Sequence, residues 1–407
     1  MAPGSDRHNF DVIVLGVGCM GAAACMTLAQ RGVRVLGLEQ FPIPHGMGSS
    51  AGESRIFRIG YYEHPDYVPL LVRARWLWKK IEDDGERLVF LPTGGLWMGP
   101  RDSELIAGTL RAATKHALQH EVLSVEEIRA RWPQFDPVRS GETNGECGRP
   151  AREGSEIVGF YEADAGMLLP ENAIETMTHL ARRHGADIRQ ETAVRSWRID
   201  GESIIVTTDH EKFHADRLIV SAGAWTAKLL PELSGVGKHA SLKVTRQAMG
   251  WYDAKAGAQF APRAMPCWAR VRNERGFFYG FPLAPGARAI KAALHEVARE
   301  VDPDAIDRVA TEADVKDLDA FMPRLFRGEV GPRFRAAICM YTNSPDGHFI
   351  MDHLPHTDCR VTVACGFSGH GFKFAPVVGE ALADLAMKGR TELPIGFLSL
   401  RRFGSAA

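Results

Sequence analysis

The chain has 407 residues, of which 45% are hydrophobic and 24% are charged, as in an ordinary globular protein with room for two domains. Its 49 Lys and Arg residues balance 50 Asp and Glu residues and leave a formal net charge of -1. This balance argues against a nucleic acid or an anionic membrane as the partner, and it predicts a small molecule instead.

The ends and the cysteines of the chain point to an intracellular setting. The stretch before Phe10 is short and polar, and no apolar run approaches the roughly 18 residues that a membrane-spanning helix needs. Seven cysteines are scattered without a CxxC pair. An odd number without metal-ligand spacing is typical of reduced thiols, so we expect a cytoplasmic protein that binds no metal.

The first 40 residues predict a complete βαβ unit. A buried strand covers Asp11 to Leu15, a glycine turn follows, a helix ends near Gly32, and a second strand runs from Val33 to Glu39. Such a unit places a turn and a helix N-terminus at the carboxyl edge of a parallel sheet, where α/β proteins bind their ligands.

Gly16, Gly18 and Gly21 form a GxGxxG motif inside this unit. The first glycine allows the tight turn, the second lets the backbone approach a pyrophosphate, and the third lets the helix pack closely on the strand. The N-H groups from Met20 onward and the helix dipole would hold the phosphates. Glu39 follows at the distance expected for a ribose-binding carboxylate. The motif predicts a dinucleotide site but does not distinguish NAD from FAD.

Further elements follow along the chain. Residues 64–84 show helical apolar spacing, and Ser124 to Glu127 form a capping box that opens a short helix stopped by Pro133. Residues 138–156 are polar and glycine-rich, which predicts an exposed loop. Residues 170–185 begin with proline and end with glycine, as a helix does.

The second half of the chain continues with strands. Residues 193–199 and 203–209 alternate in polarity around a glycine turn, and residues 217–225 read as a buried strand. A further helix is predicted from Ala313 to Leu325. The mixture of strands and helices predicts an α/β fold.

Six segments give the chain a resemblance to the monomeric sarcosine oxidase and N-methyltryptophan oxidase family. They occur in the family's order and read DVIVLGVGCMGAAA, GSSAGESRIFR, RLIVSAGAW, FYGFP, CMYTNSPDGHFIMD and GFSGHGFKF. The resemblance extends from about Phe10 to Arg402, apart from the loop near 140–155.

The resemblance implies an FAD-dependent enzyme with two domains. The expected FAD-binding domain is discontinuous, Rossmann-type and glutathione-reductase-like, and it comprises residues 1–88, 157–230 and 328–395. The expected substrate domain is built on a mixed β-sheet and comprises residues 89–156 and 231–327.

The resemblance and the glycine motif together assign a set of residues to FAD. They are Gly16, Gly18, Cys19, Met20, Gly21, Glu39, Ser49, Ser50, Arg55, Ala222, Gly223, Trp225, Cys339, Met340, Gly369, His370, Gly371, Phe372 and Lys373. Cys339 matches the cysteine that carries the flavin through an 8α-S-cysteinyl link, and a thiolate suits this role as a nucleophile. The alternative is a buried thiol beneath a non-covalent FAD. Ala51 replaces the family's usual histidine, which leaves the completeness of the attachment open.

The resemblance also implies residues that act on the substrate. Arg58 and Lys373 match two carboxylate-binding residues, and Arg suits the task because its planar fork grips a carboxylate with two hydrogen bonds. Lys291 matches the lysine at which oxygen is reduced, where a fixed positive charge stabilises the anion that forms. A surface ion pair for Arg58 and a solvated position for Lys291 are the alternatives.

Four more residues complete the expected catalytic set. Tyr279, His295 and Tyr341 match positions that line the substrate side of the ring, although His295 is nearly as well explained as a structural histidine. Arg55 matches an arginine that lies over the flavin, with Glu53 as an alternative partner.

The resemblance implies an oxidase of N-methyl L-amino acids, of the sarcosine or N-methyltryptophan type. Its reaction with O2 would give the amino acid, formaldehyde and hydrogen peroxide, and the enzyme would act as a monomer. The alternatives are an oxidase of a cyclic secondary amino acid such as pipecolate, an amine dehydrogenase with another electron acceptor, and a non-catalytic flavoprotein. Substrate identity stays open, because one methylene changes discrimination by only about 1 to 3 kcal/mol.

Overall fold

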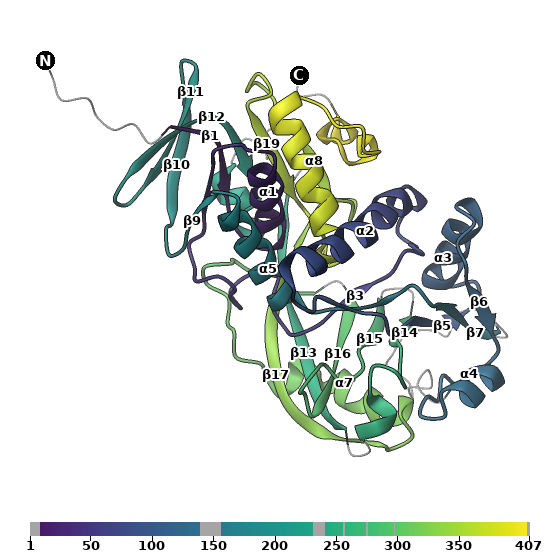
Figure 1. Ribbon diagram of the computed structural model, residues 1–407. Coiled ribbons are helices and arrows are strands. Elements are labelled where there is room, and N and C mark those ends of the chain that lie inside the picture. Colours follow the sequence, from purple (N-terminus) through teal and green to yellow (C-terminus); the bar gives the residue numbers. More distant parts are fainter. Residues whose placement is uncertain are drawn as a thin grey trace, which may run out of the picture.

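The computed structural model describes residues 9–138, 156–230, 241–254, 257–273, 276–296 and 298–404. The predicted loop at 138–156 lies outside these ranges except at its two ends. Figure 1 shows the described chain as a helix-covered sheet at one end and a second, more open sheet of long strands at the other.

The first sheet holds the predicted βαβ unit. Its strands are β1 (Asn9–Leu15), β2 (Val35–Leu38), β9 (Asp187–Arg189), β10 (Val194–Asp200), β11 (Ser203–Thr208), β12 (Lys212–Val220), β18 (Ile350–His353) and β19 (Val361–Cys365). They follow the order β10-β11-β12-β1-β2-β9, and β19 pairs with the end of β12 and with β18. The central strand β1 is parallel to both β2 and β12, so their carboxyl ends meet at one edge of the sheet.

Helices from distant parts of the chain cover this sheet. They are α1 (Cys19–Gln30), α2 (Val68–Gly85), α5 (Pro170–Arg183) and α8 (Ala375–Lys388). Ala22, Ala23 and Ala24 of α1 are fully buried, and a Cβ at Gly379 of α8 would come within 2.5 Å of the α1 backbone. Small residues therefore allow α1 and α8 to pack closely, and Figure 1 shows the two helices side by side.

The second sheet is mixed. Its strands are β5 (Gly95–Pro100), β6 (Glu121–Leu123), β7 (Ile157–Glu162), β13 (Lys243–Ala254), β14 (Cys267–Asn273), β15 (Gly276–Gly280), β16 (Ala289–Glu296) and β17 (Val330–Asn343). They follow the order β17-β13-β16-β15-β14-β5-β7-β6, in which β14 and β5 are parallel and the other pairs antiparallel.

The remaining elements connect the two sheets or cover the second one. They are α3 (Glu104–Lys115), α4 (Val125–Arg131), α6 (Thr226–Leu229), α7 (Glu312–Leu325) and a small sheet of β3 (Arg55–Phe57), β8 (Gly166–Leu168) and β4 (Phe90–Leu91). The predicted capping box of α4 is present, since Ser124 and Glu127 exchange hydrogen bonds.

The predicted α/β fold class is thus confirmed, with a Rossmann-type sheet and a second mixed sheet. The expected domain boundaries do not follow the strand pairing at two places. Strands β7 and β17 fall in the segments expected to bind FAD, yet both pair within the second sheet. Strand pairing depends on partners far away in the chain, which the local pattern does not reveal.

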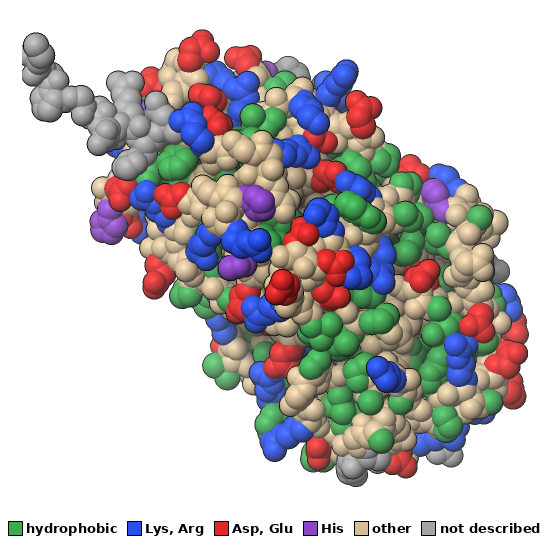
Figure 2. All heavy atoms as spheres, in the orientation of Figure 1, with side chains coloured by type: hydrophobic (Ala, Val, Ile, Leu, Met, Phe, Trp, Pro, Cys, Tyr) green, Lys and Arg blue, Asp and Glu red, His purple; other side chains and the backbone are tan. Residues whose placement is uncertain are grey.

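The surface agrees with the balanced composition. Figure 2 shows acidic and basic side chains interspersed over the visible face instead of gathered by sign. In the part of the chain that the structure describes, no helix combines the length and the apolar character needed to cross a bilayer.

Candidate active site

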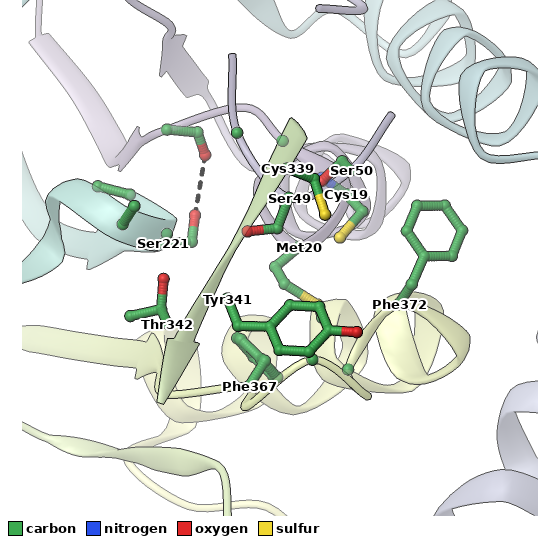
Figure 3. A pocket seen from close by; sticks show the side chains of 18 of the residues that line it. Cys19, Met20, Ser49, Ser50, Ser221, Cys339, Tyr341, Thr342, Phe367 and Phe372 are labelled. Carbon is green, nitrogen blue, oxygen red and sulfur yellow. Dashed lines mark hydrogen bonds between the residues drawn. The ribbon is translucent and has the colours of Figure 1, made fainter. Parts of the chain in front are cut away.

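A cavity of about 430 Å³ lies where the two sheets meet. Its lining comes from the β1–α1 turn, the end of β2, residues 45–58, the end of β12, the strands β15 to β17, and residues 364–373. Figure 3 shows Ser49, Ser50, Cys339, Tyr341 and Phe372 around it. Most of the residues expected to bind cofactor or substrate therefore share one cavity.

The glycine turn shapes one end of this cavity. Gly16 has a φ of +84°, and a Cβ there would lie 2.8 Å from the Cα of Ala222. A Cβ at Gly21 would lie 1.9 Å from the carbonyl oxygen of Gly16, so only glycine lets α1 start this close to β1. Gly21 itself stays outside the lining and serves the packing.

The start of α1 is open to a ligand. Gly18 is its N-cap and has no side chain to cap the helix, and the Cys19 N-H makes only a long hydrogen bond, 3.4 Å, to the Ser50 hydroxyl. The nearest described atom to a Cβ at Gly18 would be the Ser50 hydroxyl, 3.5 Å away. Exposed backbone N-H groups at the positive end of a helix dipole favour an anion such as a pyrophosphate.

Glu39 stands at the end of β2 beside this helix start. Its carboxylate accepts hydrogen bonds from the backbone N-H groups of Val17 at 2.9 Å and Phe41 at 3.1 Å. The His45 ring lies 3.5 Å from the same carboxylate. His45 also lines the cavity, and no motif or spacing in the sequence points to it.

The donor set fits an adenine dinucleotide. Thr342 lines the cavity, and its buried hydroxyl has no hydrogen-bond partner within the described chain, so a bound ligand would satisfy it. Ala222, Gly223 and Trp225, which follow β12, line the cavity as expected, and the Trp225 indole donates to Asp304 at 2.6 Å.

Cys339 lies on β17, in the wall of the cavity, with only 8% of its surface exposed. Burial raises the pKa of its thiol, while the positive charges of Arg55 and Lys291 oppose this shift. The next residue, Met340, was expected to contact the cofactor. Its side chain instead packs on the opposite face against Ala224 and Val244, because successive strand residues point to opposite sides.

Arg58 lines the other end of the cavity, where it already has a partner. Its Nη2 donates to both carboxylate oxygens of Glu63, at 2.6 and 2.7 Å, and its guanidinium lies 4.1 Å from the centre of the Tyr61 ring. Burial disfavours the charge of Glu63, yet the positive charges of Arg58 and Lys373 hold its pKa below the usual range. Sequence reasoning missed Glu63, which has no motif of its own.

Lys373 is held beside Arg58 by backbone and side-chain acceptors. Its Nζ donates to the carbonyl of His370 at 2.7 Å and to the Tyr61 hydroxyl at 3.4 Å. Burial, and then the charge of Arg58, lower the pKa of Lys373 to about 7. The ammonium is thus an easily lost charge that faces the cavity.

The His370 tautomer follows from its neighbours. Burial lowers the pKa of His370 to about 3, so the ring is neutral near pH 7. Its Nε2 lies 3.0 Å from the carbonyl oxygen of Gly347 and must donate to it. Its Nδ1 therefore accepts from the Tyr61 hydroxyl at 2.6 Å, which leaves the Tyr61 oxygen free to accept from Lys373.

Aromatic rings line the wall next to these cations. The hydroxyls of Tyr279 and Tyr341 are 3.4 Å apart, and His295 stacks on Phe277 with centroids separated by 4.9 Å. Burial lowers the pKa of His295 to about 4, so the ring is neutral near pH 7. Phe277 was absent from the expected set.

Lys291 and Arg55 lie around the loop that carries Ser49 and Ser50. Lys291 sits behind the cavity lining, and its Nζ donates to the carbonyls of Gly52 at 2.6 Å and Ser54 at 2.7 Å. Arg55 lines the cavity and donates to the Ser49 carbonyl at 2.9 Å. Glu53, the alternative partner of Arg55 in the sequence analysis, pairs with Arg335 instead.

Known proteins resemble this chain over nearly its whole length. The sequence model of one protein family, described as FAD dependent oxidoreductase, matches residues 11–385. A monomeric sarcosine oxidase of Streptomyces avermitilis is 39% identical over 400 residues, covering 98% of this chain and 99% of that protein. An N-methyl-L-tryptophan oxidase of Salmonella enteritidis is 31% identical over 399 residues, covering 97% of this chain and 99% of that protein.

Solved structures agree with the fold. NikD, an amino acid oxidase of nikkomycin biosynthesis, superposes with a TM-score of 0.81 at 25% identity, covering 97% of this chain and 98% of that one. An L-proline dehydrogenase of P. horikoshii superposes with a TM-score of 0.81 at 20% identity and supports the fold alone. That comparison covers 98% of both chains.

Proposed function

The chain belongs to the family of FAD-dependent oxidoreductases, and on this premise we propose that it is an oxidase of N-methyl L-amino acids. The observation that carries the proposal is the pair of buried cations, Arg58 and Lys373, in the same cavity as Cys339 and a neutral aromatic wall. The similarity to proteins named sarcosine oxidase and N-methyltryptophan oxidase supports it.

FAD is held, in this proposal, by the open start of α1, the Glu39 carboxylate and the unpartnered Thr342 hydroxyl. When bound, FAD supplies the redox chemistry by accepting a hydride equivalent from the carbon next to the amine. The other tasks belong to the chain, which must bind the carboxylate, keep the amine unprotonated and exclude water.

The substrate carboxylate is the proposed ligand of Arg58 and Lys373. Arg58 lines the cavity with Glu63 as its partner, so an incoming carboxylate meets a guanidinium that already binds another carboxylate. Glu63 keeps the guanidinium paired and in place before the substrate arrives, so Arg58 does not stand as a bare buried charge. Lys373 adds a second positive charge.

The wall of the cavity suits an uncharged amine. Hydride removal from the C-N bond needs the nitrogen lone pair, and burial in a low-dielectric site disfavours an ammonium group. Tyr279 and Tyr341 offer hydroxyl groups to the amine, and neutral His295 adds no repelling charge. These residues therefore orient the substrate and keep its nitrogen unprotonated.

Cys339 is the proposed attachment point of FAD, through an 8α-S-cysteinyl link. The thiol faces the cavity; burial raises its pKa, and the charges of Arg55 and Lys291 act in the opposite direction and favour the thiolate. A thiolate is the form of cysteine that attacks an electrophile. Ala51 stands where the family usually has a histidine, so Arg55 and Lys291 are the proposed source of positive charge near the thiol.

Lys291 is the proposed site of oxygen reduction. Its Nζ is held by two backbone carbonyls. Burial lowers its pKa, whereas the charges of Cys339, Glu171 and Glu53 favour the ammonium form. A fixed positive charge stabilises the negative charge that develops on dioxygen as it accepts electrons. In the overall reaction, the N-methyl amino acid, O2 and water give the amino acid, formaldehyde and hydrogen peroxide.

A peroxide assay tests the activity. Sarcosine, N-methyltryptophan, other N-methyl amino acids, proline and pipecolate are supplied in turn, and oxygen uptake is compared with the reduction of a dye. We expect peroxide and formaldehyde in equal amounts from an N-methyl amino acid. Turnover with proline or pipecolate alone, or with the dye but without oxygen, would replace the proposal with one of the alternatives.

Acid precipitation tests the cofactor linkage. A yellow pellet from wild type and a colourless pellet from Cys339→Ala are expected, because denaturation releases a flavin that is not covalently bound. A yellow pellet from both proteins would place the link at another residue. Colourless pellets from both would leave FAD non-covalent.

We further propose a monomer in the cytoplasm; the name of the monomeric sarcosine oxidase relatives supports the oligomeric state. Light scattering of the holoenzyme should give a mass close to 44.8 kDa. Twice that mass would contradict a monomer.

A further inference from the structure

A three-residue turn, Gly52 to Ser54, separates Lys291 from a carboxylate that the proposed function does not use. On one side, the Lys291 ammonium donates hydrogen bonds to the carbonyls of Gly52 and Ser54. On the other side, the Glu171 carboxylate accepts from the N-H groups of Gly52, at 2.7 Å, and Glu53, at 3.1 Å to each oxygen. Opposite charges thus grip the same short piece of backbone.

This arrangement orients the peptide groups of the turn. The peptide group between Gly52 and Glu53 has its N-H toward the Glu171 carboxylate and its C=O toward the Lys291 ammonium, and the same carbonyl also accepts from the Ser54 N-H at 2.8 Å. Hydrogen bonds linked in this way strengthen one another. Charge-assisted hydrogen bonds are also roughly twice as strong as neutral ones. The position of Lys291 therefore depends on Glu171, although the two side chains come from different elements, β16 and α5.

The backbone of the turn needs such support. Glu53 has a φ of +66°, in the left-handed region that side chains other than glycine rarely adopt. Its own carboxylate is tied down as well, since it accepts from the Trp251 indole at 2.9 Å and pairs with Arg335. Arg335 in turn lies 3.9 Å from the centre of the Trp251 ring.

We infer that Glu171 is a positioning residue for Lys291, which it holds in place through the backbone of Gly52, Glu53 and Ser54. The inference rests on the proposed role of Lys291 for its functional consequence. Glu171 would then support the oxygen step without touching the substrate, while the turn, through Ser49 and Ser50 just before it, also borders the cavity.

The charges around Lys291 are consistent with this role. Burial, and then the charge of Arg55, lower the pKa of Lys291, whereas Cys339, Glu171 and Glu53 raise it. Removal of the Glu171 charge would therefore weaken both the position of the ammonium and its protonation.

The test compares wild type with Glu171→Gln, Glu171→Asp and Lys291→Met, all as holoenzymes. Glu175→Gln is the matched control, because Glu175 lies one helical turn further along α5 and pairs with Arg87 on the surface. The first readout is hydrogen exchange of the backbone amides of Gly52 and Glu53. The second is the rate at which oxygen reoxidises the flavin after anaerobic reduction.

We expect Glu171→Gln to exchange these two amides about tenfold faster than wild type, because a neutral acceptor replaces a charged one. Lys291→Met should also speed the exchange of these two amides. If the two residues act on the same turn, the increase in exchange rate in the Glu171→Gln, Lys291→Met double variant should be smaller than the product of the two single increases. Reoxidation should slow in Glu171→Gln, with anaerobic flavin reduction unchanged. Glu171→Asp should recover part of both effects, and Glu175→Gln should match wild type.

Two results would overturn the inference. One is wild-type exchange of Gly52 and Glu53 in Glu171→Gln. The other is reoxidation at the wild-type rate in Glu171→Gln when Lys291→Met is slow. Wild-type reoxidation in Lys291→Met would instead overturn the proposed role of Lys291, and the exchange measurement would still decide whether Glu171 and Lys291 hold the turn together. If Glu171→Gln loses its fold, Glu171→Asp supplies both readouts.

Discussion

The two ends of the cavity are built in opposite ways. The dinucleotide end relies mainly on the stretch from Gly16 to Glu39, in which Gly16 and Gly18 leave room for the ligand and Gly21 lets α1 pack close to β1. The other end uses buried charged side chains, of which Arg58 and Glu63 come from the segment after β3 and Lys373 comes from the segment before α8. The first end is sensitive to added volume, whereas the second is sensitive to any change in charge.

The largest effect is expected at the dinucleotide end. Gly21→Ala places a Cβ 1.9 Å from the Gly16 carbonyl oxygen, and overpacking of this kind costs about 1 to 3 kcal/mol or more. The protein should lose FAD and show a lower unfolding temperature, as measured by flavin absorbance and calorimetry. Gly46→Ala is the control, because no described atom lies within 4 Å of a Cβ there. Full FAD content in Gly21→Ala would show that this end tolerates volume.

At the other end, Arg58→Met should reduce kcat/KM by about 100- to 1000-fold, since two charge-assisted hydrogen bonds are lost. FAD content should stay at the wild-type level, which separates the two ends of the cavity. The double variant Arg58→Met, Glu63→Gln is the control, because it removes the Glu63 carboxylate that Arg58→Met alone would leave buried without its partner. If the double variant regained wild-type kcat/KM, Arg58 would serve only to neutralise Glu63.

Tyr61→Phe should raise KM about tenfold with a smaller change in kcat, because Lys373 loses one of its two acceptors. Tyr62→Phe is the matched control, because the Arg58 guanidinium also lies 5.0 Å from the centre of the Tyr62 ring. Equal KM values in the two variants would mean that the Tyr61 hydroxyl does not position Lys373.

The smallest effect is a pH dependence of anion binding. Because the pKa of Lys373 is lowered to about 7, its charge is present below that pH and is lost as the pH rises. Acetate should therefore bind severalfold more weakly at pH 8.5 than at pH 6, as read from the flavin absorbance. Arg58 stays charged over this range, while His295 and His370, with pKa values of about 4 and 3, stay neutral. A flat profile would show that Lys373 keeps its charge.

Much of the fold could be predicted from local pattern. The βαβ unit, α5 with its proline start, and the capping box of α4 all appear where the sequence predicted them. The family resemblance is confirmed as well, and it located the cavity-lining segments around Ser49, Cys339 and Gly369. These features depend on neighbours within a few residues, so a linear pattern contains them.

What the sequence alone determined is therefore the dinucleotide end, because three glycines and a carboxylate at fixed spacing suffice to shape a phosphate-binding turn. Only the tertiary structure decided the partners of the buried charges, such as Tyr61 for Lys373 and the Gly52–Ser54 turn for Lys291 and Glu171. The reason is physical. A buried charge must find a partner in space, and folding brings that partner from any distance along the chain.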